Sequence, residues 1–320
     1  MSTEGGTKAV VAALLANTGI AITKFIAAAI SGSASMLAEG VHSLADSGNQ
    51  VLLLVGGRRS KKAADEAHPF GYGRERYVFA FVVSIILFSV GGVFSLYEGI
   101  HKLEAHEALN LPWIPLAVLA VAIVLESFSL RTAVRESNKV RGKEGWIAFI
   151  RHAKQPELPV ILLEDVAALT GLVFAFAGVG LSLLTGDVIW DAIGTIAIGV
   201  LLVAVAVILG IETKSLLVGE GASRADVTKI RDAFNASTRV EALIHMKTLY
   251  LGPDELLVAA KVAFPKTTKV ADVARAINEV EAEIRAAVPV ARVIYIEPDI
   301  YQPSNATAPS TDAIVIKGAD

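Results

Sequence analysis

Six continuous apolar runs dominate the first two thirds of the chain. Each is close to the length of about twenty residues that a helix needs to cross a bilayer, so the pattern predicts six membrane-spanning helices. The runs occupy residues 8–30, 33–55, 76–101, 112–134, 158–184 and 188–212. We therefore expect residues 1–213 to form an all-α bundle of six transmembrane helices.

The pattern changes to that of a soluble domain after residue 213. Two stretches repeat apolar residues at helical spacing, and three others read as strands. The helical stretches lie at Val227–Phe234 and Val270–Val288, and the strands lie near His245, at Val258–Phe264 and at Val293–Ile296. The order helix, strand, strand, helix, strand suits two helices on one face of a three-stranded sheet in residues 214–302. Residues 303–320 are predicted to be a flexible tail, because they are rich in Ser, Thr, Ala and Pro.

Basic residues indicate the orientation of the chain in the membrane. They cluster in the loops after the second and fourth apolar runs, whereas the loops after the first, third and fifth carry only Lys102. The positive-inside rule then places both termini in the cytoplasm. The first residues show neither a presequence nor a signal-peptide pattern, so the first run is expected to remain a membrane span. We predict a multi-pass protein of the cell membrane, in contact with lipid.

Composition narrows the chemistry. Of 320 residues, 53% are hydrophobic and 19% charged, which is too apolar for an ordinary soluble domain. The net charge of -3, with no basic run interleaved with aromatic residues, argues against nucleic acid as a partner. The absence of cysteine excludes disulfides and thiolate ligands, so any bound metal must use nitrogen and oxygen atoms.

Ionisable residues inside the second apolar run are the first candidates for function. Glu39, His42, Asp46 and Asn49 follow i, i+3, i+7, i+10 spacing, which places them on one stripe of a helix. Such groups at membrane depth mark an ion path, a proton relay or a binding site by default. His42 and Asp46 can reach one metal ion together, with Asp165 of the fifth run as a third ligand. The alternative is a buried polar pair that only locks two helices together.

Other charged residues in the apolar runs have narrower roles. Glu164 and Asp165 are adjacent and point about 100° apart on a helix, so one is expected to bind metal and the other to relay protons or pair with a cation. Lys24 has no lone pair and is a candidate counter-ion, not a ligand. Three acidic residues near run ends are expected to snorkel or to cap loops: Glu98, Glu126 and Asp191.

Two weaker metal sites are possible outside the apolar runs. Asp65 and His68 lie in the loop after the second run, where a turn that contacts lipid headgroups is an equally good interpretation. His245 on a predicted strand and Glu297 at the end of another are the candidates in the soluble domain.

Two motifs give the chain a recognisable likeness. The stretch SASMLAEGVHSLAD at residues 33–46 and the loop HPFGYGR at residues 68–74, together with six runs and an α+β domain, resemble the cation diffusion facilitator family of metal-proton exchangers. LLEDVAA at residues 162–168 is similar to the subgroup that contains mitochondrial zinc transporter nine. The resemblance implies a homodimer, proton-driven metal export from the cytoplasm and a metallochaperone-like (ferredoxin-like αββαβ) cytoplasmic domain.

The resemblance also implies ligand positions. His42 and Asp46 match the family's pair on the second span, and Asp165 matches one of its two positions on the fifth. The other position is Ile161, which cannot ligate, so Glu164, Asn49, Glu39 or water is expected to complete the site.

The family's two accessory sites match this sequence only in part. Asp65 and His68 match the family's loop, although Tyr72 stands where a second His is common. In the soluble domain His245 and Glu297 match, while Tyr295 replaces a His, so that domain is expected to dimerise without metal.

We therefore hypothesise a divalent cation/proton antiporter, not an enzyme, with no cofactor. Zn²⁺, or Mn²⁺, Fe²⁺ or Co²⁺, is its expected substrate, and H⁺ the coupling ion. A non-transporting metal-sensing membrane scaffold is the rival interpretation. An intramembrane hydrolase fits less well, because no general base or substrate cleft can be assigned.

Overall fold

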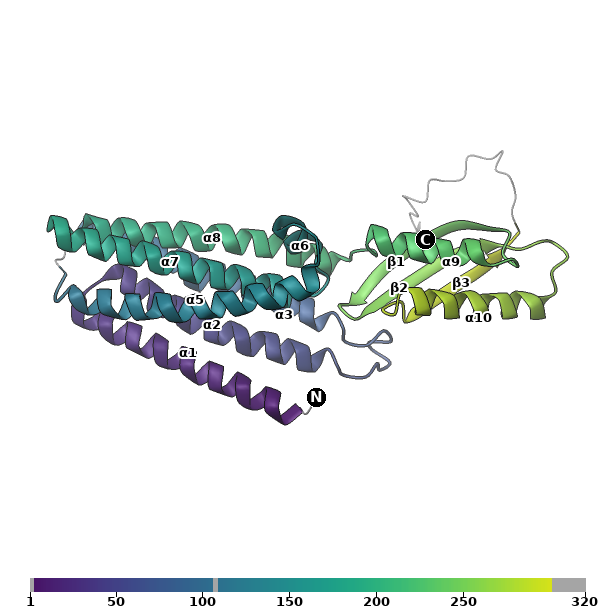
Figure 1. The fold of residues 1–320 in the computed structure, drawn as a ribbon, viewed down its shortest axis with the longest axis horizontal. Coiled ribbons are helices and arrows are strands. Elements are labelled where there is room, and N and C mark those ends of the chain that lie inside the picture. The colour runs from purple at the N-terminus through teal and green to yellow at the C-terminus, as the bar shows by residue number, and fades with distance from the viewer. Residues whose placement is uncertain (1–2, 106–108, 301–320) are drawn as a thin grey trace, which may run out of the picture. The chain divides into compact units, whose positions relative to one another are not determined.

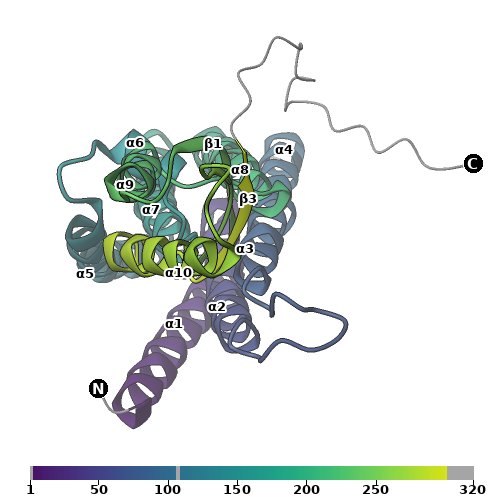
Figure 2. The same cartoon turned by 90° about the vertical axis from the view of Figure 1, so that its right-hand side faces the viewer.

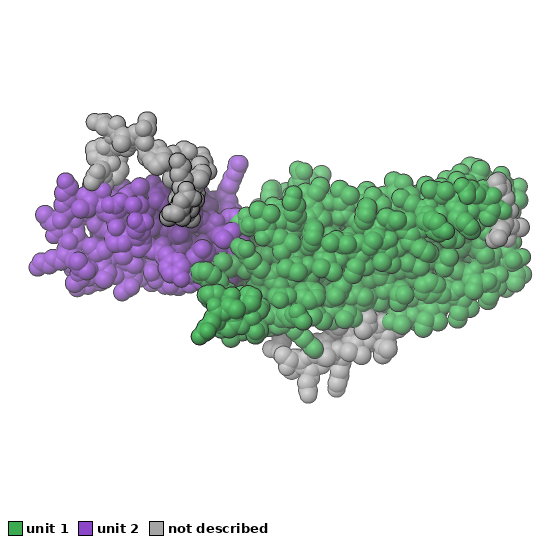
Figure 3. Space-filling model, turned by 180° about the vertical axis from the view of Figure 1, so that it is seen from behind, with its two compact units in different colours: residues 1–220, 251–254 green, residues 221–250, 255–320 purple. Residues whose placement is uncertain are grey.

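The computed structural model describes residues 3–105 and 109–300, with side chains from residue 17 onward. The chain divides into two compact units, residues 1–220 with 251–254 and residues 221–250 with 255–320 (Figure 3). The boundary expected at residue 213 falls inside a helix, because two charged residues there end the apolar run without ending the helix. The expected tail lies outside the described residues.

The first unit consists of helices. They are α1 (Thr3–Ser31), α2 (Ala34–Arg59), α3 (Glu75–Ile86), α4 (Phe94–Ala105), α5 (Trp113–Arg141), α6 (Trp146–His152), α7 (Glu157–Thr185) and α8 (Ile189–Val218) (Figure 1). A π-helical stretch, Leu87–Val93, joins α3 and α4 into one continuous helix. Each of the predicted apolar runs is helical, as expected.

Four helical stretches in the described part of the chain are long and apolar enough to cross a membrane. They are Glu75–Ala105, Trp113–Arg141, Glu157–Thr185 and Ile189–Val218. Helix α2 has a comparable length, but its polar side chains lower its hydropathy, and the apolar part of α1 that can be assessed is only Asn17–Ser31. The first unit is thus a helical, membrane-like region.

Small residues let the helices of this unit pack closely. Helix α8 lies along α7 and along the α3–α4 helix. A Cβ atom on Gly199 would come within 2.8 Å of the backbone nitrogen of Leu96, so the backbones of α8 and α4 approach more closely there than larger side chains would allow. Helix α1 packs against α2 and α5, and its N-terminal end points away from the other helices (Figure 2).

The start of α2 is fixed by α8. Gly32 adopts a φ of 68° between α1 and α2, and Ser33 then caps α2 by accepting a hydrogen bond from the Met36 backbone nitrogen (3.2 Å). Asp191 of α8 accepts hydrogen bonds from Ser33 Oγ (2.9 Å) and from the Ala34 backbone nitrogen (2.8 Å). Asp191 was expected to snorkel or to cap a loop; it does act as a cap, but at the start of a different helix, and it anchors the helix that carries the polar stripe.

The second unit is a small α+β domain. Its elements are α9 (Arg224–Ala236), β1 (Ala242–Gly252), β2 (Glu255–Ala263), α10 (Val270–Ala287) and β3 (Val293–Asp299), in the order predicted. The strands lie in the order β1-β2-β3, and β2 and β3 run parallel with Val258 opposite Ile294. Alternate residues of β2 are buried in one core with Ile230 of α9 and Ile284 of α10. Both helices therefore cover the same face of the sheet.

Candidate functional site

The polar stripe of α2 faces the protein interior. Glu39 and Asn49 are 0% exposed and His42 is 1% exposed, while the Asp46 side chain keeps 18% of its surface. Helix α2 packs against α1, α3, the π-helical stretch and α7, and the stripe meets α1, α7 and the π-helical stretch. The 3.6-residue period of the sequence thus placed these four residues on one face that is turned toward the protein interior.

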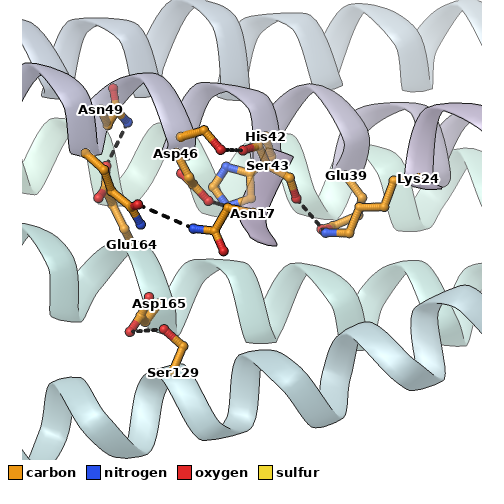
Figure 4. Close-up of polar contacts among 12 residues, drawn as sticks. Asn17, Lys24, Glu39, His42, Ser43, Asp46, Asn49, Ser129, Glu164 and Asp165 are labelled. Carbon is orange, nitrogen blue, oxygen red and sulfur yellow. Dashed lines mark hydrogen bonds and ion pairs between the residues drawn. The ribbon is translucent and has the colours of Figure 1, made fainter. Parts of the chain in front are cut away.

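His42 and Asp46 form the centre of the stripe. His42 Nε2 lies 3.4 Å from Asp46 Oδ2, one helical turn along α2 (Figure 4). The two ring nitrogens of His42 and the Oδ1 atom of Asp46 form no hydrogen bond with any described residue. A Cβ atom on Gly91, in the π-helical stretch, would lie 4.0 Å from His42 Nδ1, so the ring sits against backbone there. A buried imidazole and a carboxylate with unused lone pairs can both bind a cation.

Glu39 is engaged by a lysine of α1. Lys24 Nζ donates to Glu39 Oε2 (3.0 Å) and to Ser43 Oγ (2.7 Å), and both charged side chains are almost completely buried. The other carboxylate oxygen of Glu39 points at α7, where a Cβ atom on Gly171 would come within 2.7 Å of it. Lys24 is therefore a counter-ion, as expected, and Glu39 is held by it in this state.

The two acidic residues of α7 point to different partners. Asn49 Nδ2 of α2 donates to Glu164 Oε1 (2.8 Å), and Glu164 is 5% exposed. Asp165, half-buried, instead accepts from Ser129 Oγ of α5 (3.2 Å), apart from His42 in Figure 4. This divergence is what adjacent positions on a helix impose.

The candidate ligands are close in space but do not yet share one ion position. In the described part of the chain, no three His, Asp or Glu side chains converge in a geometry that could hold a metal. Ile161, one turn before Asp165, is 36% exposed and apolar. The arrangement thus offers one imidazole–carboxylate pair on α2 and two carboxylates on α7 that hydrogen-bond elsewhere.

Asp65 and His68 of the α2–α3 loop lie together. Asp65 accepts from Tyr72 Oη (2.7 Å), from Lys62 Nζ (3.0 Å) and from the His68 backbone nitrogen (2.8 Å). The hydrogen bonds from Tyr72 and Lys62 hold the pKa of Asp65 well below its usual value. This carboxylate is neutralised by protein groups, and the tyrosine that replaces the family's second His is one of them.

The two candidates in the sheet domain are not brought together. His245 is exposed on β1, and Glu297 on β3 forms an ion pair with Lys261 of β2 (3.1 Å). Because β2 lies between β1 and β3, the two residues are separated by about two strand spacings, roughly 10 Å. Sequence alone could not show this, since strand order is a property of the tertiary fold.

Comparison with known proteins gives the chain its family. Residues 10–218 match the model of the cation efflux transmembrane domain. The chain belongs to the cation diffusion facilitator, or cation efflux, family. The boundaries of the match cover all the long helices described above, from within α1 to the end of α8.

Several proteins similar to this cation efflux protein carry names that describe a function or a cellular location. The mitochondrial proton-coupled zinc antiporter SLC30A9 of Xenopus laevis is 31% identical over 267 residues, which are 82% of this chain and 48% of that protein. Metal tolerance protein C4 of Arabidopsis thaliana is 30% identical over 80% of this chain and 57% of its own. Magnetosome protein MamB of Magnetospira sp. is 26% identical, over 85% and 89%. The chain spans about half the length of the first of these.

One acidic residue of this cation efflux protein was placed wrongly by sequence reasoning. Glu126 was expected to snorkel or cap near a run end, but α5 continues to Arg141 and Glu126 lies in its middle. It lines a pocket with Asn17, Ile20, Ser43 and Asp46. Glu126 and Ser129 are three residues apart and therefore lie on one face of α5. This spacing was the signal in the sequence that could have identified Glu126 as part of a polar face.

Proposed function

We propose that this protein exchanges a divalent metal cation for protons and exports the metal from the cytoplasm. Zn²⁺ is the first substrate to test, and Mn²⁺, Fe²⁺ and Co²⁺ are the alternatives that nitrogen and oxygen ligands accept. The observation that carries the proposal is the His42–Asp46 pair, with Nε2 and Oδ2 3.4 Å apart inside the helical unit of a cation efflux protein. The names of relatives, among them a proton-coupled zinc antiporter, support the same assignment.

His42 and Asp46 are the proposed ligands from α2, and Asp165 and Glu164 the proposed carboxylates from α7. The α7 carboxylates are now held by Asn49 and Ser129. Metal binding requires these hydrogen bonds to be exchanged for metal bonds as α7 and α2 adjust. Such an exchange keeps each α7 carboxylate bound either to a hydrogen-bond donor or to the metal, so neither loses its polar partner.

Coupling follows from competition for the same lone pairs. Imidazole and carboxylate bind a metal only in their deprotonated forms, so metal binding releases protons and proton binding releases metal. Rocking of the helices that exposes the site to one side and then the other converts this competition into exchange. No chemical transformation of a substrate is involved, so the protein is a secondary transporter.

The remaining architecture is part of the same proposal. We place six spans in the cell membrane with both termini in the cytoplasm, in keeping with the basic loops. The α+β domain is assigned to homodimerisation without bound metal, because its two candidate ligands lie on non-adjacent strands. Its exposed sheet face is available to a second copy of the chain.

The test is metal-dependent proton flux in proteoliposomes that contain the purified protein and an internal pH dye. His42→Ala combined with Asp46→Ala is expected to abolish flux for Zn²⁺, Mn²⁺, Fe²⁺ and Co²⁺ alike. A matched control, His101→Ala with Glu98→Gln, removes an imidazole and a carboxylate from α4, and is expected to retain it. Wild-type flux in the α2 double variant refutes the proposal. Absence of flux in the wild type, with metal binding retained, favours a metal-sensing scaffold.

A further inference from the structure

Glu126 is an acidic side chain in the middle of an otherwise apolar helix. Helix α5 is long and apolar enough to cross a membrane, and little of its apolar surface is buried within the helical unit. Glu126 itself is half-buried. A carboxylate at this depth is unfavourable without a compensating role.

On one side Glu126 meets α2. It lines the same pocket as Asp46, together with Asn17 and Ile20 of α1 and Ser43 of α2. Asn17 and Ser43 bring an amide and a hydroxyl to this pocket, so its lining is polar where these helices meet. A cation in this pocket therefore contacts carboxylates from α2 and from α5.

On another side Glu126 approaches α7. Ser129 lies one turn further along the same face of α5, and its hydroxyl donates to Asp165 Oδ2 (3.2 Å). Glu126 also interacts electrostatically with Asp46, Asp165 and His42. Glu126 thus shares a pocket with Asp46 of α2 and lies one turn from the serine that holds Asp165 of α7, and the repulsion among these carboxylates favours a cation nearby.

An independent feature points to a ligand in the same region. The His42 side chain is 1% exposed, and no described hydrogen-bond partner meets its ring nitrogens. Its Nε2 atom points at the carboxylate of Asp46, 3.4 Å away, which lines the pocket. Buried polar atoms are normally satisfied, so the His42 ring nitrogens and Asp46 Oδ1, which form no hydrogen bond with a described residue, leave lone pairs for a ligand that binds both side chains.

We propose that Glu126 is a ligand of the transported cation, supplied by α5. The inference rests on the proposed function and adds to it a helix that the family resemblance did not assign. Glu126 would complete a set with His42, Asp46 and Asp165. These side chains do not converge on one position in the described structure, so the set forms only when Asp165 exchanges its hydrogen bond with Ser129 for the cation. One nitrogen and three carboxylates make an oxygen-rich set, and oxygen-rich sets favour Mn²⁺ relative to Zn²⁺ more than imidazole-rich sets do.

The experiment measures equilibrium binding of Co²⁺, Mn²⁺ and Zn²⁺ to the purified full chain, with Co²⁺ absorption reporting the coordination. Glu126→Gln and Glu126→Ala are expected to weaken Mn²⁺ and Co²⁺ binding at least about tenfold, as loss of even an outer partner of a metal ligand does. Zn²⁺ binding should weaken less. Glu126→Asp should restore most of the affinity, and Glu98→Gln, a half-buried carboxylate of α4, should change nothing.

Transport of the same proteins separates the possible outcomes. If the wild type transports and both Glu126 variants bind and transport as it does, the ligand role is refuted while the proposed function stands. If the wild type binds metal without transport and the variants lose binding, the proposed function fails and the ligand role stands. If the wild type binds none of the three metals, both are overturned. Elution of each variant as a single species in size-exclusion chromatography confirms that it is folded.

Discussion

Replacing Lys24 with methionine should strongly destabilise the helical unit. The substitution keeps an apolar stem but removes the ammonium that donates to Glu39 Oε2 at 3.0 Å. Glu39 is 0% exposed, and its Oε1 atom has no hydrogen-bond partner among the described residues. Lys24→Met therefore leaves a buried carboxylate without a counter-ion, a change that costs about 3–5 kcal/mol in the free energy of unfolding.

A double-mutant cycle tests this reasoning. Lys24→Met together with Glu39→Met replaces the ion pair by two apolar side chains, which is expected to be close to neutral or stabilising, because no uncompensated charge remains. Unfolding in detergent micelles is followed by the fluorescence of the three tryptophans. Lys139→Met is the matched control, since it removes a 61% exposed lysine of α5 from its pair with Glu136, and it should change stability by less than about 0.5 kcal/mol. A loss for Lys24→Met no larger than that of the control would refute the argument.

Two further predictions concern packing and pH. Gly171→Ala places a Cβ 2.7 Å from Glu39 Oε1 and should destabilise the protein by about 1–3 kcal/mol in the same unfolding assay. Gly180→Ala is the control and should not destabilise the protein, because the nearest atom to its new Cβ is 3.8 Å away. Equal effects of the two substitutions would count against the packing argument. Tyr72→Phe should raise the pKa of Asp65 toward its usual value, measured by carboxyl NMR. Because the pKa of Asp65 is lowered in the folded loop, the ionised carboxylate stabilises the fold at pH values above the ordinary carboxyl pKa. This stabilisation is lost as the pH falls through the lowered value. An unchanged titration of Asp65 in Tyr72→Phe would contradict the assigned cause.

The local structure was largely predictable. Helical spacing in the sequence placed Glu39, His42, Asp46 and Asn49 on one buried face of α2, and the alternation in β2 identified its core face. These predictions held because both patterns depend only on residue spacing within one element. That Asp191 lies at the start of α8 was equally local, but the helix start that it caps, that of α2, is set by tertiary packing.

The partners of these residues were not predictable in the same way. Lys24 pairs with Glu39, Asn49 holds Glu164, and Asp165 turns to Ser129, all between different helices. Each pairing depends on how far a helix is rotated about its axis and where it crosses its neighbour. Those quantities come from the packing of the whole unit.

The sequence by itself determined that this protein has a helical, membrane-like unit with a buried polar stripe, followed by a small α+β domain. Hydrophobic periodicity encodes these features locally, one element at a time. Only the tertiary structure decided that Glu126 of α5 lines a pocket with Asp46, and that His245 and Glu297 are separated by β2. The physical reason is that contacts between distant segments follow from close packing of whole elements, which no single stretch of sequence specifies.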